Sequence, residues 1–366
     1  MGTPADDRCV RFAAAGDILL ASPAPGASAS SYSDSIYGDV KDLFADCDVV
    51  LGNLECTLPG VGETVPTEPR VIATPELVRT VKPAGFNVLT LANNHAFDCL
   101  AAGFHHVRGL LDELGIAHFG AGDNLEEASR PAVLEANGIR IAFLAAVGRR
   151  TGAAHVATTD HWGVAPMDVD RLADDIRRLR DEVHHVILSL HWGEERFLIP
   201  SPEQVEQAHR LADAGASMII GHHPHVIQGM EVYRGVPIIY SLGNLVACEV
   251  PYSDGDTLTW NRKERTGCLL LAELTLKDVR HVHQVPAFDS GQSVSIDRTG
   301  FGRGLITRAN RALSRGVTLG RYRREHLWVK TLKPALRHLL PSELLKLRPA
   351  KIRKAIAGIL QARRAR

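Results

Sequence analysis

Features that define several classes of protein are absent from this sequence of 366 residues. No apolar run approaches the roughly 18 residues of a membrane span. The N-terminal segment MGTPADDRCVRF is acidic and polar, whereas a secretion signal is basic and then apolar. We therefore expect a protein that is not exported and resides in the cytoplasm.

Cysteines are few and far apart, and the six present form no close pairs of the zinc-knuckle or redox type. Scattered thiols in a chain of this size are typical of a reducing compartment. A phosphate-binding glycine loop and a nucleotide fingerprint are also missing, which argues against an ATP-dependent ligase of the ordinary kind. The remaining composition, with 45% hydrophobic and 23% charged residues, is that of a globular protein with a substantial core.

The net charge of zero conceals an asymmetry along the chain. Residues 301–366 contain 18 Lys and Arg but only two acidic residues, so 40 of the 42 acidic residues lie in the first 300. In the tail, Leu and Ile alternate with Lys and Arg at helical spacing. We predict one domain over residues 1–300 and a basic amphipathic helical tail over 301–366. The tail either packs on the domain or contacts an acidic peptide or, weakly, a membrane surface.

Short apolar runs alternate with stretches of helical spacing between residues 10 and 245, which predicts a layered α/β domain. Strands are expected in VRFAAAGD, where the run ends at Gly16 and Asp17, and in DVVLGNLE, NVLTLANNH, IRIAFLAAV, HHVILSLH and ASMIIGHH. A hairpin is expected to turn at Arg234 and Gly235. The predicted helices cover residues 75–82, 101–114, 169–183 and 202–214.

Polar side chains follow these strands at the point where each strand ends. In LTLANNHAFD, an apolar run stops at two amides, an imidazole and a carboxylate. Ligands of open α/β sheets bind beyond the carboxyl ends of the strands, so we expect such groups to converge on one site. Carboxylate, amide and imidazole ligands together suit a manganese, iron or zinc ion, and the oxygen ligands alone could hold calcium. The converging set is Asp17, Glu55, Asn94, His95, His191, His223 and His225.

Six segments carry a resemblance to a known family: AAGDILL, GNLECTL, LANNHAFD, LSLHWGEE, GHHPHVIQG and IYSLGNLV. In this order they resemble the successive motifs of CapA-like capsule-synthesis proteins, a branch of the calcineurin-like metallophosphoesterases. The resemblance covers about residues 10–250 and implies layered β-sheets flanked by helices around a divalent metal site. By position, the implied metal ligands are Asp17, Glu55, Asn94, His191, His223 and His225.

Two positions depart from the phosphoesterase pattern. Leu19 stands where the Asp-x-His motif has its histidine, and Asn53 stands where a bridging aspartate is normal, with Glu55 as the nearest carboxylate. A close pair of metal ions needs that negative charge to hold it together. One ion, or loosely held metal, is therefore expected in place of a tight pair, and ordinary phosphatase activity is expected to be reduced.

The groups that remain are suited to proton transfer. His95 and Asp98 lie three residues apart, a spacing that lets the carboxylate orient the imidazole on a turn. Asp17 beside His223 or His225 would form a second pair across the pocket. Two such pairs around a Lewis-acidic cation are what Cα epimerisation requires, because one removes the proton and the other returns it from the opposite face. The predicted catalytic residues are His95, Asp98, Asp17 and His225.

Four further residues are expected to support the ligands or to contact a substrate. Glu194 follows His191 closely and is expected to act as its partner. Trp192 is either a substrate platform or a packing residue at the sheet edge. The other two are Asn53 and His222.

The resemblance leaves three functions open. CapA-like proteins include membrane-associated proteins of poly-γ-glutamate or capsule synthesis, and also cytoplasmic enzymes that tailor ribosomally made peptides. One branch of the latter epimerises the C-terminal residue of lasso-peptide precursors. The altered phosphatase motifs and the intact His/Asp pairs favour that branch, with a peptide as the partner and no nucleic acid. Capsule biosynthesis and metal-dependent phosphoester hydrolysis are the alternatives.

Overall fold

The computed structural model describes residues 8–22 and 36–334. The chain divides into two units, Met1–Thr318 and Leu319–Arg366. In the second unit, helix α9 (Leu319–His326) is followed by a π-helical segment (Leu327–Leu332). The predicted helical character of the tail is therefore present as far as it is described, and its remaining segments lie outside the described residues.

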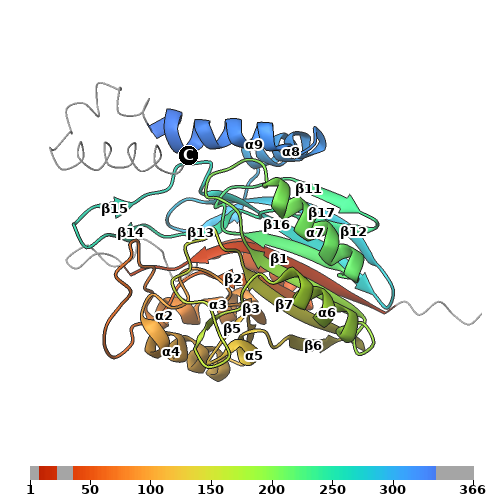
Figure 1. The fold of residues 1–366 in the computed structure, drawn as a ribbon, viewed down its shortest axis with the longest axis horizontal. Coiled ribbons are helices and arrows are strands. Elements are labelled where there is room, and N and C mark those ends of the chain that lie inside the picture. Colours follow the sequence, from red (N-terminus) through yellow and green to blue (C-terminus); the bar gives the residue numbers. More distant parts are fainter. Residues whose placement is uncertain (1–7, 23–35, 335–366) are drawn as a thin grey trace, which may run out of the picture. The chain divides into compact units, whose positions relative to one another are not determined.

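The first unit contains a mixed sheet with β1 at its centre (Figure 1). Strands β2, β3 and β4 continue it in parallel on one side, while β16, β17 and β18 continue it in antiparallel fashion on the other. The carboxyl end of β1 also pairs in parallel with β13. These strands are β1 (Cys9–Leu19), β2 (Val49–Leu54), β3 (Val88–Thr90), β4 (Ala117–Phe119), β13 (Asn244–Ala247), β16 (Thr266–Thr275), β17 (Val279–Asp289) and β18 (Val294–Ile296).

A second sheet has the strand order β11-β12-β10-β9-β7-β6. Its four central strands are parallel, and an antiparallel strand closes each edge. The strands are β6 (Ala132–Ala136), β7 (Ile139–Val147), β9 (His185–His191), β10 (Met218–His222), β11 (Met230–Tyr233) and β12 (Val236–Ile239). Two small ribbons pair β5 (Ala121–Gly122) with β8 (Gly163–Val164) and β14 (Val250–Pro251) with β15 (Thr257–Leu258).

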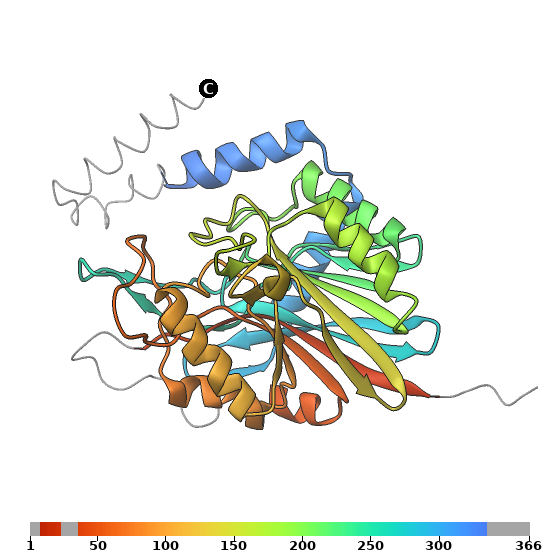
Figure 2. The same cartoon turned by 60° about the horizontal axis from the view of Figure 1, so that its bottom comes forward.

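Helices cover the outer faces of both sheets. Helices α6 and α7 pack on the second sheet (Figure 1), and α4 contacts β4 at the edge of the first (Figure 2). Ser201 and Gln204 form a reciprocal capping box that begins α7, and Gly215 ends it in the left-handed conformation. The helices of this unit are α1 (Val40–Ala45), α2 (Pro75–Arg79), α3 (Val81–Ala84), α4 (Leu100–Glu113), α5 (Leu125–Ala128), α6 (Val169–Leu179), α7 (Pro202–Ala214) and α8 (Phe301–Ser314).

The main core lies between the two sheets. The rings of Phe12 on β1 and Phe143 on β7 stack there with centroids 6.4 Å apart. Because side chains alternate along a strand, β9 directs Ile187 into this core and Leu188 into the second core under α6 and α7. The predicted α/β class with layered sheets and flanking helices is thus confirmed.

Several predicted boundaries differ in detail. The strand expected to end at Asp17 continues to Leu19, because β13 pairs with its last residues across an irregularity in register. The helix expected over 75–82 is divided at Thr80, which ends α2 and begins α3. The hairpin does turn at Arg234 and Gly235, both of which have positive φ.

Helix α8 belongs to the first unit, where it contacts β11, β16 and β17. Its buried residues Gly302, Ala309 and Leu313 form the contacting face. The division between the units therefore falls after Thr318, whereas the sequence predicts a boundary at residue 300. Across residues 8–22 and 36–334, none of the helices combines the length and the apolar character needed to cross a bilayer.

Candidate metal centre

The centre forms where the carboxyl ends of four parallel strands meet. Asp17 on β1 is in register with Asn53 on β2, and His191 on β9 is in register with His222 on β10. Gly16 permits the close approach of the segment that leads into β13, since a Cβ at that position would lie 1.9 Å from the carbonyl oxygen of Gly243. Residues from both sheets therefore face one another at a shared edge, as the strand-end pattern predicts.

Asp17 is the most heavily bonded residue of the centre and is fully buried. Its Oδ1 accepts a hydrogen bond from Asn53 Nδ2 at 2.9 Å and lies 3.1 Å from His222 Nδ1. Its Oδ2 accepts the backbone N–H of His223 at 3.1 Å and lies 3.3 Å from His225 Nδ1. The expected carboxylate and imidazole pair therefore involves His222 and His225, while His223 contributes its backbone to Asp17.

Glu55 is also fully buried, yet neither of its carboxylate oxygens has a hydrogen-bond partner in the described part of the chain. Its Oε1 lies 3.6 Å from His191 Nε2 and 3.9 Å from His225 Nε2. Among the described residues, two groups of possible metal ligands share Glu55: Glu55 with His191 and His223, and Glu55 with Asp17 and His225. The ligand atoms of each group all lie within 4.8 Å of one another.

A divalent cation fits these residues. An unpaired buried carboxylate is costly unless a cation compensates it, and separations near 3.6 Å are those of two ligands around one ion with bonds of about 2.1 Å. Asn94 Oδ1 lies 2.6 Å from His191 Nε2 and adds a neutral oxygen ligand. The mixed oxygen and nitrogen donors suit a borderline ion. The residues that would hold it are Asp17, Glu55, Asn94, His191, His223 and His225.

Burial and the charges of neighbouring groups shift the pKa values of these residues in different directions. Burial, and then the charge of Asp17, raise the pKa of Glu55 well above its ordinary value. Burial and the neighbouring His225 lower the pKa of His223 to about 3. Burial opposes the charged form of His225, but Glu55 and Asp17 outweigh it and raise that pKa to about 10. His223 is thus already in the neutral form that binds metal, whereas an ion must displace a proton from His225.

The same balance leaves Asp17 ionised and His191 neutral. Burial alone would raise the pKa of Asp17, yet hydrogen bonds from His222 and His225 hold it well below its ordinary value. Burial and the neighbouring His223 lower the pKa of His191 well below its ordinary value. Both groups are therefore in the protonation state that a metal ligand needs.

The loop of GHHPH is strained where it enters the centre. His223 has φ of +93° and His225 has φ of +54°, values that residues other than glycine rarely adopt. Such conformations cost energy and persist where the surroundings enforce them, commonly at functional sites. Here both residues, which flank Pro224, bring a ring nitrogen within 4.8 Å of a Glu55 oxygen.

A separate imidazole and carboxylate pair lies beside the centre. His95 Nδ1 is 2.7 Å from Asp98 Oδ2, so the predicted contact at this spacing is present. The same oxygen accepts the backbone N–H of Val71 at 2.7 Å, and the backbone N–H of His95 donates to Asn93 at 3.1 Å. Asp98 orients the ring through Nδ1 and leaves Nε2 for proton transfer.

The supporting residues predicted from the sequence differ in their positions. Asn53 bridges the sheets, since its Nδ2 also lies 3.3 Å from His191 Nδ1. Glu194 is half-buried, with Oε1 3.9 Å from Arg150 Nη1. Trp192 does not fit the role of a substrate platform, because its ring is buried under α6 and α7 and stacks on Tyr240. The alternation of side chains along β9 explains this, since His191 points into the centre and Trp192 away from it.

Asn244 is a member of the centre that the sequence did not single out. Its Oδ1 lies 2.8 Å from His225 Nδ1, and its Nδ2 donates to the carbonyl of Glu264 at 3.0 Å. Its position in IYSLGNLV, one of the segments that carry the family resemblance, was an available signal, although Asn244 begins β13 and does not end a strand. The pairing of β13 with β1 brings it to the site.

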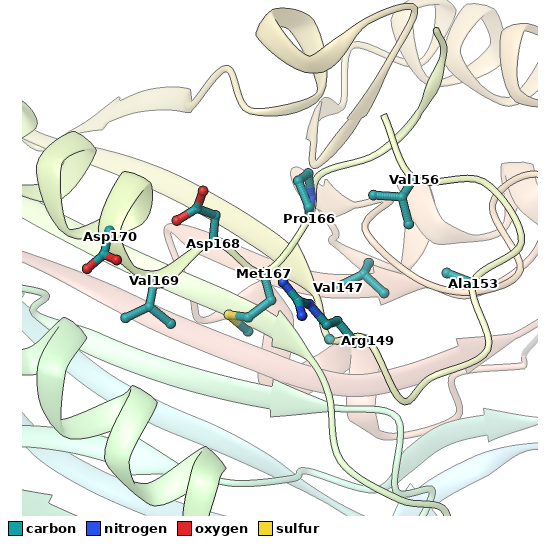
Figure 3. A pocket seen from close by; sticks show the side chains of 10 residues that line it. Val147, Arg149, Ala153, Val156, Pro166, Met167, Asp168, Val169 and Asp170 are labelled. Carbon is teal, nitrogen blue, oxygen red and sulfur yellow. The ribbon is translucent and has the colours of Figure 1, made fainter. Parts of the chain in front are cut away.

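A cavity of about 560 Å³ lies at the end of β7 (Figure 3). Val147, which lines it, is in register with His191 on the neighbouring strand β9, and the N–H of Gly148 donates to the carbonyl of His191 at 2.8 Å. Val156, Met167 and other apolar side chains form much of its wall. Arg149, Asp168 and Asp170 also line it, so the cavity offers room for a group with both apolar and polar parts, one strand away from His191.

Curated proteins are similar to this chain in sequence. The capsule biosynthesis protein CapA of Bacillus anthracis is 34% identical over 222 residues, which cover 58% of this chain and 54% of that protein. The PGA biosynthesis protein CapA of Bacillus subtilis is 32% identical over 234 residues, which cover 63% and 61%. The chain thus spans between half and two thirds of the length of these curated relatives.

Among solved structures, a phosphatase from Mycoplasma pneumoniae has a TM-score of 0.48 at 14% identity, covering 81% of this chain and 99% of that one. A 5′-nucleotidase from Candida albicans has a TM-score of 0.43 at 11% identity, covering 83% and 58%. The family model of the bacterial capsule synthesis protein PGA_cap matches residues 11–249. The predicted CapA-like resemblance is confirmed, and the chain belongs to this family of bacterial capsule synthesis proteins.

Proposed function

We propose that this protein is a metal-dependent acid–base enzyme that epimerises the Cα of a residue, the C-terminal one, in a ribosomally made peptide such as a lasso-peptide precursor. The observation that carries the proposal is the placement of the bonded pair His95–Asp98 next to a buried cluster of unpaired metal-ligand atoms. This combination provides a base and a site for negative charge in one pocket.

The reaction needs two proton-transfer groups on opposite faces of the Cα. His95, oriented by Asp98, is suited to one of these positions. The two metal-ligand groups share Glu55, so an ion bound by Glu55, His191 and His223 would leave His225 free to pair with Asp17. One pair removes the Cα proton, the electrons move to the adjacent carbonyl oxygen, and the other pair returns a proton to the opposite face. When bound, the cation supplies stabilisation of the charge on that oxygen.

The surroundings of the centre suit a peptide. The cavity at the end of β7, the strand next to β9, has a mixed lining of apolar and charged side chains and a volume of about 560 Å³, enough for a large side chain (Figure 3). The residue to be epimerised could place its side chain there. A contact between the peptide and the basic tail, and a location in the cytoplasm, are further parts of the proposal.

Deuterium incorporation tests the proposal directly. The protein is loaded with manganese, calcium, zinc or iron and incubated in heavy water with the precursor peptides encoded near its gene. One peptide should gain one mass unit at a single Cα in heavy water and no mass in ordinary water, with inverted configuration in chiral analysis. His95→Asn should lower the rate of epimerisation by about 10²–10⁴-fold. Absence of exchange in every peptide with every metal would refute epimerisation.

Poly-γ-glutamate or capsule biosynthesis is a second candidate, and the family match over residues 11–249 favours it. Under this function the protein would act on a glutamate polymer or on the machinery that makes it. In a strain that makes such a capsule and lacks its own CapA-like protein, expression of this chain should restore polymer. Restoration by the wild type and loss with Glu55→Gln would favour this candidate over peptide epimerisation.

Phosphoester hydrolysis is a third candidate, favoured by the two ligand groups that share Glu55, an arrangement able to hold two ions. It predicts turnover of p-nitrophenyl phosphate that depends on added manganese. No metal-dependent turnover would count against it.

A further inference from the structure

Arg196 lies immediately beside the metal centre, although the sequence did not single it out. Its backbone N–H donates to the carbonyl of Pro224 at 2.8 Å, and Pro224 separates the ligand candidates His223 and His225. Its φ of +69° is a left-handed conformation that arginine rarely adopts. Strain of this kind concentrates at functional sites. The backbone thus fixes Arg196 against the loop that carries two histidines of the centre.

A buried carboxylate fixes the side chain of Arg196 in turn. Its Nε donates to Glu264 Oε1 at 2.9 Å, and the Glu264 side chain is only 5% exposed. The other oxygen of Glu264 accepts the backbone N–H of Asn261 at 3.0 Å. The Glu264 carbonyl accepts a hydrogen bond from Asn244, which also contacts His225 Nδ1. A chain of hydrogen bonds therefore links the guanidinium to a metal-ligand candidate.

This guanidinium is held along one edge only. Arginine has five N–H donors, and the bond to Glu264 uses the one on Nε. Across residues 8–22 and 36–334, neither Nη group of Arg196 donates a hydrogen bond, and 37% of the side chain is exposed. Two parallel N–H groups on a rigid plane match the oxygens of a carboxylate or a phosphate. The open edge is therefore a preformed anion-binding group.

The charges of Glu195 and Arg196 act on titratable groups in and around the centre. Burial and Glu195 raise the pKa of the Tyr252 phenol, and Arg196 opposes them. Glu195 also acts on Glu55 and His223 inside the centre. Because the centre contains the carboxylates of Asp17 and Glu55, an anionic substrate needs a cation nearby, and Arg196, bonded to Pro224 between two histidines of the centre, supplies one.

We propose that Arg196, oriented by Glu264, binds an anionic group, a carboxylate or a phosphate, of the molecule processed at the metal centre. The inference rests on the proposed function only in placing a substrate there, because the anion can bind without turnover. A carboxylate adjoining the reacting Cα would match epimerisation. A phosphate would match ester hydrolysis.

Binding of two small probes tests the inference. The full-length protein, with and without manganese, is titrated with N-acetylalanine and separately with inorganic phosphate, and ligand-observed NMR measures the dissociation constants. Arg196→Gln should raise the constant of at least one probe about tenfold, the expected loss of a charge-assisted hydrogen bond. Arg196→Lys keeps a cation for Glu264 but lacks the planar fork, so it should fold normally and still bind the probe more weakly.

Arg79 provides the matched control, because both of its Nη groups already donate to Glu113, at 2.9 and 2.8 Å. Arg79→Gln should bind both probes like the wild type. If the Arg196 variants lose affinity for N-acetylalanine only, the group that Arg196 binds is a carboxylate. If they lose affinity for inorganic phosphate only, that group is a phosphate. Wild-type affinity of both Arg196 variants, an equal loss in Arg79→Gln, or no binding of either probe to the wild type would overturn the inference. Because this experiment measures binding, its result is independent of whether deuterium exchange is observed.

Discussion

The carboxylate and imidazole groups of this protein fall into two regions that differ in how their hydrogen bonds are completed. At His95 and Asp98, the contact is closed at 2.7 Å, and Val71 satisfies the same carboxylate oxygen. In the metal centre, both oxygens of Glu55 and one nitrogen each of His222 and His223 are buried without a partner in the described chain. The first region is complete without a ligand, whereas the second is incomplete.

This difference assigns separate roles to chemically similar groups. Buried polar atoms without partners cost free energy, so a protein retains them where a ligand completes them. A closed pair keeps one imidazole nitrogen oriented and the other available for a proton. We infer that the first region transfers protons only, whereas the second binds the cation and supplies Asp17 and His225 as the other proton-transfer pair when His225 is not a ligand.

The largest effect is expected from Glu55→Gln, because Glu55 belongs to both ligand groups. Removing its charge should weaken divalent metal binding by roughly 100-fold or more and abolish turnover. The thermal stabilisation by metal, about 2.7 kcal/mol at a hundredfold excess over the dissociation constant, should disappear. Calorimetric titration with manganese and melting curves with and without metal measure both effects.

Glu231→Gln is the control for this change. Glu231 Oε1 accepts a hydrogen bond from the Tyr240 hydroxyl at 2.7 Å and lies 2.9 Å from His209 Nε2. Glu231 is on β11, at the edge of the second sheet. Glu231→Gln should lower the stability of the folded protein and leave its affinity for metal unchanged. Equal metal affinity of the wild type and Glu55→Gln would show that Glu55 is not a metal ligand.

A smaller and more selective effect is expected from His95→Asn. Loss of a general acid or base lowers turnover by about 10²–10⁴-fold, while metal affinity should stay within about twofold of wild type because the pair lies outside both ligand groups. Asp98→Asn should lower turnover less, because both hydrogen bonds reach Oδ2, which an amide oxygen can replace. Loss of metal binding in His95→Asn would show that His95 also contributes to the metal site, so that the two regions have no separate roles.

The sequence predicted the convergence of the centre for a physical reason. Parallel strands end at a common edge, so Asp17 and His191 could be placed together although 174 positions separate them in the numbering. The pair His95–Asp98 followed from local spacing alone. The alternation of side chains along β9 could also have predicted the position of Trp192, which must face away from the centre when His191 faces it.

Other contacts could not be read from spacing. The histidine partners of Asp17 depend on the positive φ values of His223 and His225, which redirect the side chains of GHHPH. Asn244 reaches the centre through the pairing of β13 with β1. Arg196 and Glu264 are joined across 68 residues of sequence. Long-range packing fixes these contacts, and no local pattern specifies them.

The smallest effect concerns the dependence of stability on pH. In the metal-free protein the pKa of His225 is raised to about 10 from 6.5, and that of Glu55 is raised well above 4.5. A raised pKa means that the folded state holds its proton more tightly, so this stability is complete below the unfolded pKa and is lost as pH rises through the folded one. The melting temperature of metal-free protein should therefore fall between pH 6 and 9, on the order of 5 °C.

A cation that takes His225 as a ligand, as in the group of Glu55, Asp17 and His225, reverses this trend, because it replaces the proton on His225 and binds better as pH rises. The gap in melting temperature between metal-bound and metal-free protein should accordingly widen from pH 6 to pH 8.5. His95→Asn should show the same widening, since the closed pair takes no part in it, and Glu55→Gln should show none. Parallel melting curves with and without metal across this range would mean that His225 is not a ligand. The cation would then be held by Glu55, His191 and His223 alone, which is the arrangement that leaves Asp17 and His225 available as the second acid–base pair.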